Sequence, residues 1–137
     1  MKTIIPTLTV EFDEINKCAV KTEGKIDVII DTSVYAEQRW EENFPANAAK
    51  ETLFAYCERI LGEEKKVTKA KVLSALKALY CFIESDKLPD FKSFCQLFNI
   101  AEVDYVNELT EKMTLVFNVA LNGSATDLKN SKRTGKP

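Results

Sequence analysis

The spacing of apolar residues changes about thirty residues into the chain. In the opening stretch TIIPTLTVEF, the apolar positions Leu8, Val10 and Phe12 lie two residues apart, a spacing that places side chains on one face of a half-buried strand. KCAVKT and GKIDVIIDT continue the extended pattern, and the turn between them is expected at Glu23-Gly24. We therefore predict a small β-hairpin or sheet over the first thirty residues.

From Asp31 onward, apolar residues recur at intervals of three and four, the spacing of amphipathic helices. The oxygens of DTS can cap a first helix over about 33–44, and Pro45 ends it. Four more helices are predicted, and the third of the five is expected to be the central, most buried one. Their expected apolar faces are Ala49, Leu53, Tyr56, Cys57, Ile60 and Leu61; Val72, Leu73, Leu76, Leu79, Tyr80 and Ile83; Phe91, Phe94, Cys95 and Phe98; and Val103, Val106, Leu109, Met113, Val116, Phe117 and Ala120.

This pattern predicts an α+β fold that is predominantly α-helical, with a small N-terminal β-hairpin or sheet followed by about five short helices. One globular domain is expected over 1–123, divided into a β-rich start at 1–30 and a helical body at 33–122. The last segment, 124–137, has Leu128 as its one large apolar residue, which is too little to offset the entropy of ordering the chain. We expect it to be a disordered, flexible tail, and it is basic.

The overall composition is that of an ordinary globular domain. Of 137 residues, 45% are hydrophobic and 29% charged, with a formal net charge of −2, and this length suits a single domain. No run approaches the ~18 apolar residues of a membrane-spanning helix. A proline interrupts the short apolar stretch near the start, which is unlike a signal peptide. We therefore expect a cytoplasmic protein with no membrane partner.

The composition also excludes most kinds of catalytic site. The chain has no histidine, which excludes histidine acid–base catalysis, Ser-His triads and His-ligated metals. Its four glycines are too far apart to build a phosphate-binding loop. Its four cysteines form no CxxC pair, so buried, reduced thiols are expected at Cys57, Cys81 and Cys95, and a zinc site is disfavoured. We predict no enzymatic activity, no cofactor and no metal.

Residues 31–45, DTSVYAEQRWEENFP, contain the only tryptophan of the chain. On a helix, Trp40 would lie above Phe44 and Tyr35 above Arg39, with the two pairs on different sides. In one interpretation these rings pack against other helices, and Arg39 covers an aromatic face. In the other they form an exposed patch, since Trp, Tyr and Arg are enriched at interface hot spots. Tyr35, Arg39, Trp40 and Phe44 are our hypothesis for a patch that builds or borders a partner-binding surface.

The β-rich start, followed by IDTSVYAEQRWEENFP, LFAYCERI and KVLSALKALYCFIES, resembles the tail assembly chaperones of long-tailed, siphovirus-like phages and prophages of Gram-positive bacteria. The resemblance covers about residues 25–122. It implies a non-catalytic protein that binds unassembled tail tube protein and tape measure protein in the cytoplasm of the bacterial host. It also implies that the protein is absent from the mature virion, and that a frameshifted longer form is often made.

Other functions stay open at this point. A structural phage component, such as a head–tail connector or a tail completion protein, is the first alternative. A nucleic-acid-binding regulator would use lysines on the third helix, but an acidic body repels phosphate, so nucleic acid is disfavoured as a partner. An enzyme comes last, for lack of a convergent catalytic set. Self-association through the last helix, whose apolar spacing is close to a heptad, is a further hypothesis.

Overall fold

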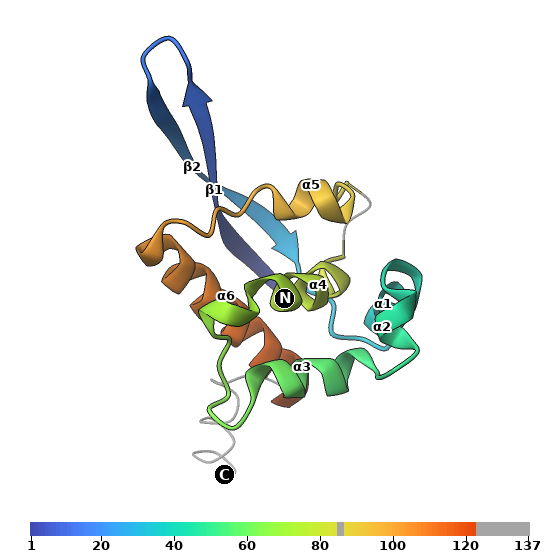
Figure 1. Ribbon diagram of the computed structural model, residues 1–137. Helices are drawn as coiled ribbons and strands as arrows, with labels where there is room; N and C mark the ends of the chain where they lie inside the picture. The colour runs from blue at the N-terminus through green and yellow to red at the C-terminus, as the bar shows by residue number, and fades with distance from the viewer. Residues whose placement is uncertain (85–86, 123–137) are drawn as a thin grey trace.

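The protein has a two-stranded N-terminal hairpin followed by a mostly helical body (Figure 1). The computed structural model describes residues 1–84 and 87–122; the predicted tail, 124–137, lies outside the described residues. The α+β class with predominant helix is therefore confirmed. The elements are β1 (Lys2–Asp13), β2 (Cys18–Ile29), α1 (Tyr35–Asn43), α2 (Pro45–Ala48), α3 (Leu53–Leu61), the 3-10 helix η1 (Lys69–Lys71), α4 (Val72–Phe82), α5 (Phe91–Cys95) and α6 (Val103–Asn122).

The hairpin consists of two long strands, so the prediction of a turn at Glu23-Gly24 is wrong. β1 and β2 pair antiparallel from Lys2–Ile29 to Asp13–Cys18, and Gly24 lies inside β2, opposite Thr7. The chain reverses after Asp13, whose carboxylate accepts hydrogen bonds from the backbone of Ile15 (2.9 Å) and Asn16 (3.1 Å), an Asx-type turn. At Gly24 a Cβ would lie 2.9 Å from the Thr7 hydroxyl, so the glycine serves close approach of the strands.

The base of the hairpin is held against the helical body. Ile5 and Val28 are buried in the core, and the backbone N–H of Leu8 donates to the carbonyl of Leu97 at 2.9 Å. From α6, the Tyr105 hydroxyl donates to the carbonyl of Pro6 at 2.8 Å. The distal half of the hairpin extends away from the helices (Figure 1). The hairpin therefore has an anchored base and a projecting tip.

The chain between Asp31 and Thr52 is divided by its capping residues. The first helix starts at Tyr35 and ends at Asn43, and Pro45 begins the short helix α2. The prediction that Ala49 lies on the apolar face of the second helix is wrong, because Ala49 is exposed and precedes α3. Thr52 explains the break, because its side chain accepts a hydrogen bond from the backbone of Ala55 at 3.1 Å and starts a new helix there.

The N–H groups of the first three residues of α3, which have no partner within the helix, all have side-chain acceptors. The Glu37 carboxylate of α1 accepts from the backbone of Leu53 (2.8 Å) and Phe54 (3.2 Å). The Thr52 hydroxyl accepts from the backbone N–H of Ala55 at 3.1 Å. The Thr52 carbonyl accepts the first bond of the helix itself, from Tyr56 at 3.0 Å. The first turn of a helix leaves these donors unpaired unless side chains reach them. Glu37 thus joins α1 to α3 by capping a helix other than its own.

Helix α4 is the central helix, as predicted. It packs against α1, α3, α5 and α6. Two predicted positions of its apolar face differ: Leu73 is 60% exposed, and Ile83 lies beyond the helix, where it bridges Ile30. The buried residues of the helix are Val72, Ala75, Leu76, Ala78, Leu79, Cys81 and Phe82.

The last two helices follow the predicted faces closely. In α5, Phe94 is fully buried. Phe98, which follows the end of this helix, is also buried and bridges Leu8 of β1. In α6, the predicted face is buried except at its ends, where Val103 is 58% exposed and Ala120 is half-buried. The buried apolar residues of α6 are Val106, Leu109, Met113, Val116 and Phe117.

The predicted burial of three thiols is confirmed for two of them. Cys57 and Cys81 are buried and Cys95 is half-buried, whereas Cys18 at the hairpin tip is exposed. Burial raises the pKa of the Cys57 thiol, and burial raises the pKa of Cys81 to about 12. Both core thiols are therefore protonated and unreactive at neutral pH.

Candidate protein-binding surface

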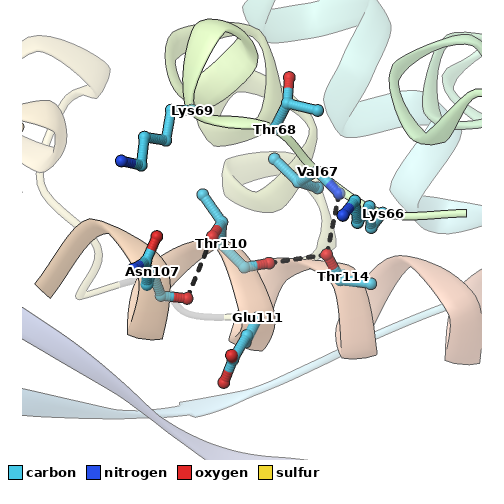
Figure 2. Close-up of a pocket in the computed structure, with 8 residues that line it drawn as sticks. All are labelled: Lys66, Val67, Thr68, Lys69, Asn107, Thr110, Glu111 and Thr114. Carbon is cyan, nitrogen blue, oxygen red and sulfur yellow. Dashed lines mark hydrogen bonds between the residues drawn. The ribbon is translucent and has the colours of Figure 1, made fainter. Parts of the chain in front are cut away.

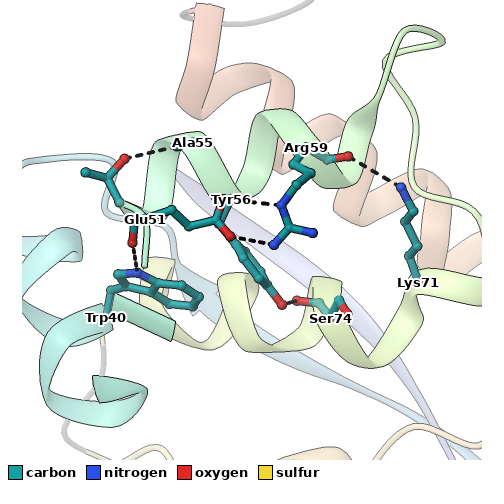
Figure 3. Close-up of polar contacts among 8 residues, drawn as sticks. Trp40, Glu51, Ala55, Tyr56, Arg59, Lys71 and Ser74 are labelled. Carbon is teal, nitrogen blue, oxygen red and sulfur yellow. Dashed lines mark hydrogen bonds and ion pairs between the residues drawn. The ribbon is translucent and has the colours of Figure 1, made fainter. Parts of the chain in front are cut away.

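Trp40 belongs to the core. Its side chain is 1% exposed, and its indole N–H donates to the carbonyl of Glu51 at 3.0 Å (Figure 3). The ring centroid lies 4.6 Å from that of Tyr56 and 5.6 Å from that of Phe44. A tryptophan so enclosed anchors α1 to α3. It cannot touch a partner directly.

The residues around Trp40 also fasten α3 to α4. The Tyr56 hydroxyl donates to the carbonyl of Ser74 at 3.0 Å, and burial raises the pKa of this tyrosine. Arg59 pairs with Glu51 at 2.5 Å, and the Lys71 ammonium donates to the carbonyl of Arg59 at 3.4 Å (Figure 3). These contacts hold α3 and the start of α4 in place around the buried indole.

Arg39 joins the start of α1 to the end of α4. Its Nε donates to the carbonyl of Cys81 at 2.6 Å, and its Nη2 pairs with the Asp31 carboxylate at 2.9 Å. The guanidinium carbon lies 5.2 Å from the centroid of the Tyr35 ring, within range of a cation–π contact. Arg39 thus covers an aromatic face, as one of the two interpretations predicted, while its N–H groups are used inside the protein.

We expect stability to fall at low pH partly through Asp31. Hydrogen bonds from Ser33, and then Arg39, lower the pKa of Asp31 to about 2. A lowered carboxyl pKa contributes stability above the unfolded-state value of about 3.9, and that stability is lost as the pH falls toward 2. Asp31→Asn should therefore cost about 1 kcal/mol at pH 7, discounted for partial exposure of the carboxylate.

Urea unfolding of wild type and Asp31→Asn at pH 7, 4 and 2 measures this difference. The difference should shrink toward zero at the lowest pH. Glu41→Gln, on the exposed side of α1, is the control and should differ little from wild type at pH 7. An Asp31→Asn difference that is the same at pH 7 and pH 2 would contradict the assignment.

Phe44 and Tyr35 lie at the two ends of the stretch, and their environments differ. Phe44 is half-buried, with its ring centroid 5.0 Å from that of Phe91 and 5.7 Å from the Lys77 ammonium. Tyr35 is 55% exposed, and the preceding Val34 is 83% exposed. Of the four hypothesised residues, Tyr35 alone presents a large part of its ring to solvent. The partner-binding role of this patch stays a hypothesis, centred on Tyr35.

The hairpin tip carries a second set of exposed apolar side chains, which sequence reasoning missed. Phe12 is 66% exposed, and Ile15 in the turn is 91% exposed. Val10 and Val20 are exposed at 37% and 47%. The alternation of Val10 and Phe12 predicted a half-buried strand, but within residues 1–84 and 87–122 no second layer covers this part of the hairpin (Figure 1). The one available signal was Ile15, an apolar residue inside the polar turn sequence DEINK.

A hollow of about 410 Å³ lies between residues 66–69 and α6 (Figure 2). Its hydroxyl groups bond to the protein itself: Thr114 accepts from the backbone of Val67 at 2.9 Å and donates to the carbonyl of Thr110 at 2.7 Å. The Thr110 hydroxyl donates to the carbonyl of Asn107 at 3.0 Å. The Thr114 hydroxyl therefore connects the loop at Val67 to α6. Nothing in its geometry indicates a reaction.

Residues 1–84 and 87–122 can also be assessed for metal sites and for membrane-spanning helices. Within these residues, no three acidic or cysteine side chains lie close enough together to hold a metal ion. None of the helices described there combines the length and apolar character needed to cross a membrane. Comparisons of the chain with protein-family models, with curated proteins and with solved structures gave no match. The exposed surfaces of this chain are therefore the features that bear on its function.

Proposed function

We propose that this protein is a tail assembly chaperone of a siphovirus-like phage or prophage, and that it acts by binding alone. Its partners are the unassembled tail tube protein, the tape measure protein, or both. It works in the cytoplasm of the bacterial host and is absent from the mature virion. The resemblance described above supports this proposal, and the projecting hairpin is the observation that carries it.

The hairpin tip suits a protein that holds another protein temporarily. Exposed aromatic and aliphatic side chains on a projecting element mark interaction sites more often than scattered single residues do. Phe12 and Ile15 are exposed at 66% and 91% on the projecting part of the hairpin. A small apolar surface of this kind gives modest affinity, which lets an assembling tail displace the chaperone.

The charge around the hairpin favours basic partner segments. Glu23 of β2, Glu102 just before α6, and Asp104 and Glu108 of α6 line one hollow beside the strands. Lys21 pairs with Glu102 and neutralises one of these acids. An acidic surface next to an apolar tip speeds encounter with basic, amphipathic segments, mainly through the association rate. We expect binding to weaken as the salt concentration rises.

Co-purification with the tail tube and tape measure proteins of the same phage tests the proposal. The double variant Phe12→Ser/Ile15→Ser should bind at least tenfold more weakly than wild type, the loss of about 1.4 kcal/mol or more that a hot-spot residue contributes. Tyr35→Ala tests the patch at the start of α1 separately. Leu73→Ser is the matched control, since Leu73 is exposed to a similar extent, 60%, on a different surface.

The outcomes separate the function from the surface. If wild type binds neither tail protein, or if purified virions contain the protein in stoichiometric amounts, the chaperone function is wrong. Stoichiometric presence would favour the structural-component alternative. If wild type binds and the hairpin variant binds equally well, the function stands and the hairpin is not its surface. Circular dichroism of each variant must match wild type for these comparisons to hold.

A further inference from the structure

The outer edge of β2 presents a row of backbone groups without strand partners. In an antiparallel pair, residues alternate between facing the partner strand and facing away from it. The N–H of Leu8 donates to Leu97 on the far side of β1, so Leu8 and its cross-strand neighbour Glu23 face away from each other. By the same alternation, Lys21 and Lys25 also point their N–H and C=O groups outward from β2.

Three other observations agree with this alternation. Pro6, two residues from Leu8, has no N–H, and its carbonyl accepts from Tyr105 outside the ladder. On β2, the outward carbonyl of Ile29 accepts from the backbone of Glu84 at 2.8 Å. Ile30 then bridges Ile83. The β2 edge is therefore covered at its base, whereas among the described residues it has no strand partner from Ala19 to Lys25.

The side chains on this open edge alternate in sign. Protective edges usually carry lysine, which repels an approaching strand. Here Lys21, Glu23 and Lys25 carry positive, negative and positive charges in turn on one face of the sheet. A second copy of the same edge, running antiparallel, can place each charge opposite its complement, and opposite charges across strands stabilise pairing.

We propose that a second copy of this chain pairs its β2 edge with this one, antiparallel, with Thr22 facing Thr22. The result is one four-stranded sheet, in the order β1-β2-β2-β1, around a two-fold axis. Lys21 of each copy then lies opposite Glu23 of the other. Ala19 lies opposite Lys25. A two-fold contact of this type is closed, so it forms a dimer.

Charge and space select this register over its neighbours. Centring the axis on Glu23 would place Glu23 opposite Glu23 and Lys21 opposite Lys25. Centring it on Lys21 would likewise pair two lysines. Centring it on Gly24 restores opposite charges, but it places Ala19 of the second copy opposite Ile29, whose carbonyl already accepts from Glu84. With Thr22 at the centre, the added strand ends at Cys18, opposite Ile26, before the covered base.

Disulfide trapping tests the register in the full-length protein. Facing residues that do not exchange hydrogen bonds lie about 4.5 Å apart at Cα, which is within disulfide range. Thr22→Cys in a Cys18→Ser background should form a covalent dimer under mild oxidation, and Glu23→Cys in the same background should not. Cys57 and Cys81 are buried, so they do not compete.

Sedimentation of the purified chain gives an independent readout that requires no tail protein. Wild type should be dimeric, Lys21→Glu should dissociate at least tenfold more readily, and Lys21→Glu/Glu23→Lys should restore the wild-type dimer. Lys21 also pairs with Glu102 within the chain, so circular dichroism must show that the single variant is folded. A monomeric wild type overturns the proposal. A dimer that Lys21→Glu leaves unchanged, or that Glu23→Cys traps as well as Thr22→Cys, also overturns it.

Discussion

Trp40→Ala is expected to lower the free energy of unfolding by about 3–5 kcal/mol, the range measured for removing a large aromatic ring from a core. The indole is enclosed between α1 and α3, and its N–H is the donor to the carbonyl of Glu51. The substitution leaves a cavity beside Tyr56 and Phe44 and deprives that carbonyl of its partner. Urea denaturation at neutral pH, followed by circular dichroism, measures the change.

Two further variants separate the contributions of the ring and its location. Trp40→Phe keeps an aromatic ring but loses the N–H donor, so it should cost less than Trp40→Ala. Tyr35→Ala, five residues earlier and 55% exposed, should change stability by less than about 1 kcal/mol. A Trp40→Ala protein as stable as wild type would show that the indole is not part of the core.

Glu37→Ala is expected to cost about 2–3 kcal/mol. Its carboxylate accepts hydrogen bonds from the backbone of Leu53 and Phe54, and bonds to charged groups are worth more than neutral ones. The substitution leaves two partly buried donors at the start of α3 without an acceptor and removes a negative charge from a helix N-terminus. Equilibrium unfolding in urea measures the loss.

Two control variants separate the capping contribution of Glu37 from the effect of its charge. Glu37→Gln keeps one acceptor oxygen and should lose only part of the stability. Glu41→Ala, one turn further along α1 and exposed, removes the same charge without touching α3 and should be nearly neutral. If Glu41→Ala costs as much as Glu37→Ala, the effect comes from net charge, and the proposed capping across helices is wrong.

The helical half of the fold could be predicted because each apolar face repeats over several turns. The α6 face, from Val106 to Phe117, is buried as its spacing predicts. Helix boundaries were less predictable where a single side chain decides them. Thr52 delays the start of the second predicted helix, whose expected face began at Ala49, to Leu53. Glu37 caps α3 from sixteen residues away, a contact that no local pattern can show.

The hairpin shows why a correct strand pattern can still give a wrong turn. Gly24 has the composition of a turn residue, but its missing side chain is used to approach Thr7. The real turn contains Ile15, an apolar residue that obscures the turn signal from Asp13. For the candidate patch, the sequence left two interpretations of the rings in the stretch 31–45, packing or exposure. It could not show which ring is buried, because burial depends on α3 and α4 packing against α1.

The opposite edge of the sheet is interrupted at its middle. Along β1, Pro6 has no hydrogen to donate, its carbonyl is occupied by Tyr105, and the N–H of Leu8 is taken by Leu97. An incoming strand would find its ladder broken at these two residues, which disfavours joining through β1 after two copies have joined through β2. Strand addition is therefore expected to stop after one step. Concentrated protein should remain in short, finite particles and should not elongate into fibrils that bind thioflavin T.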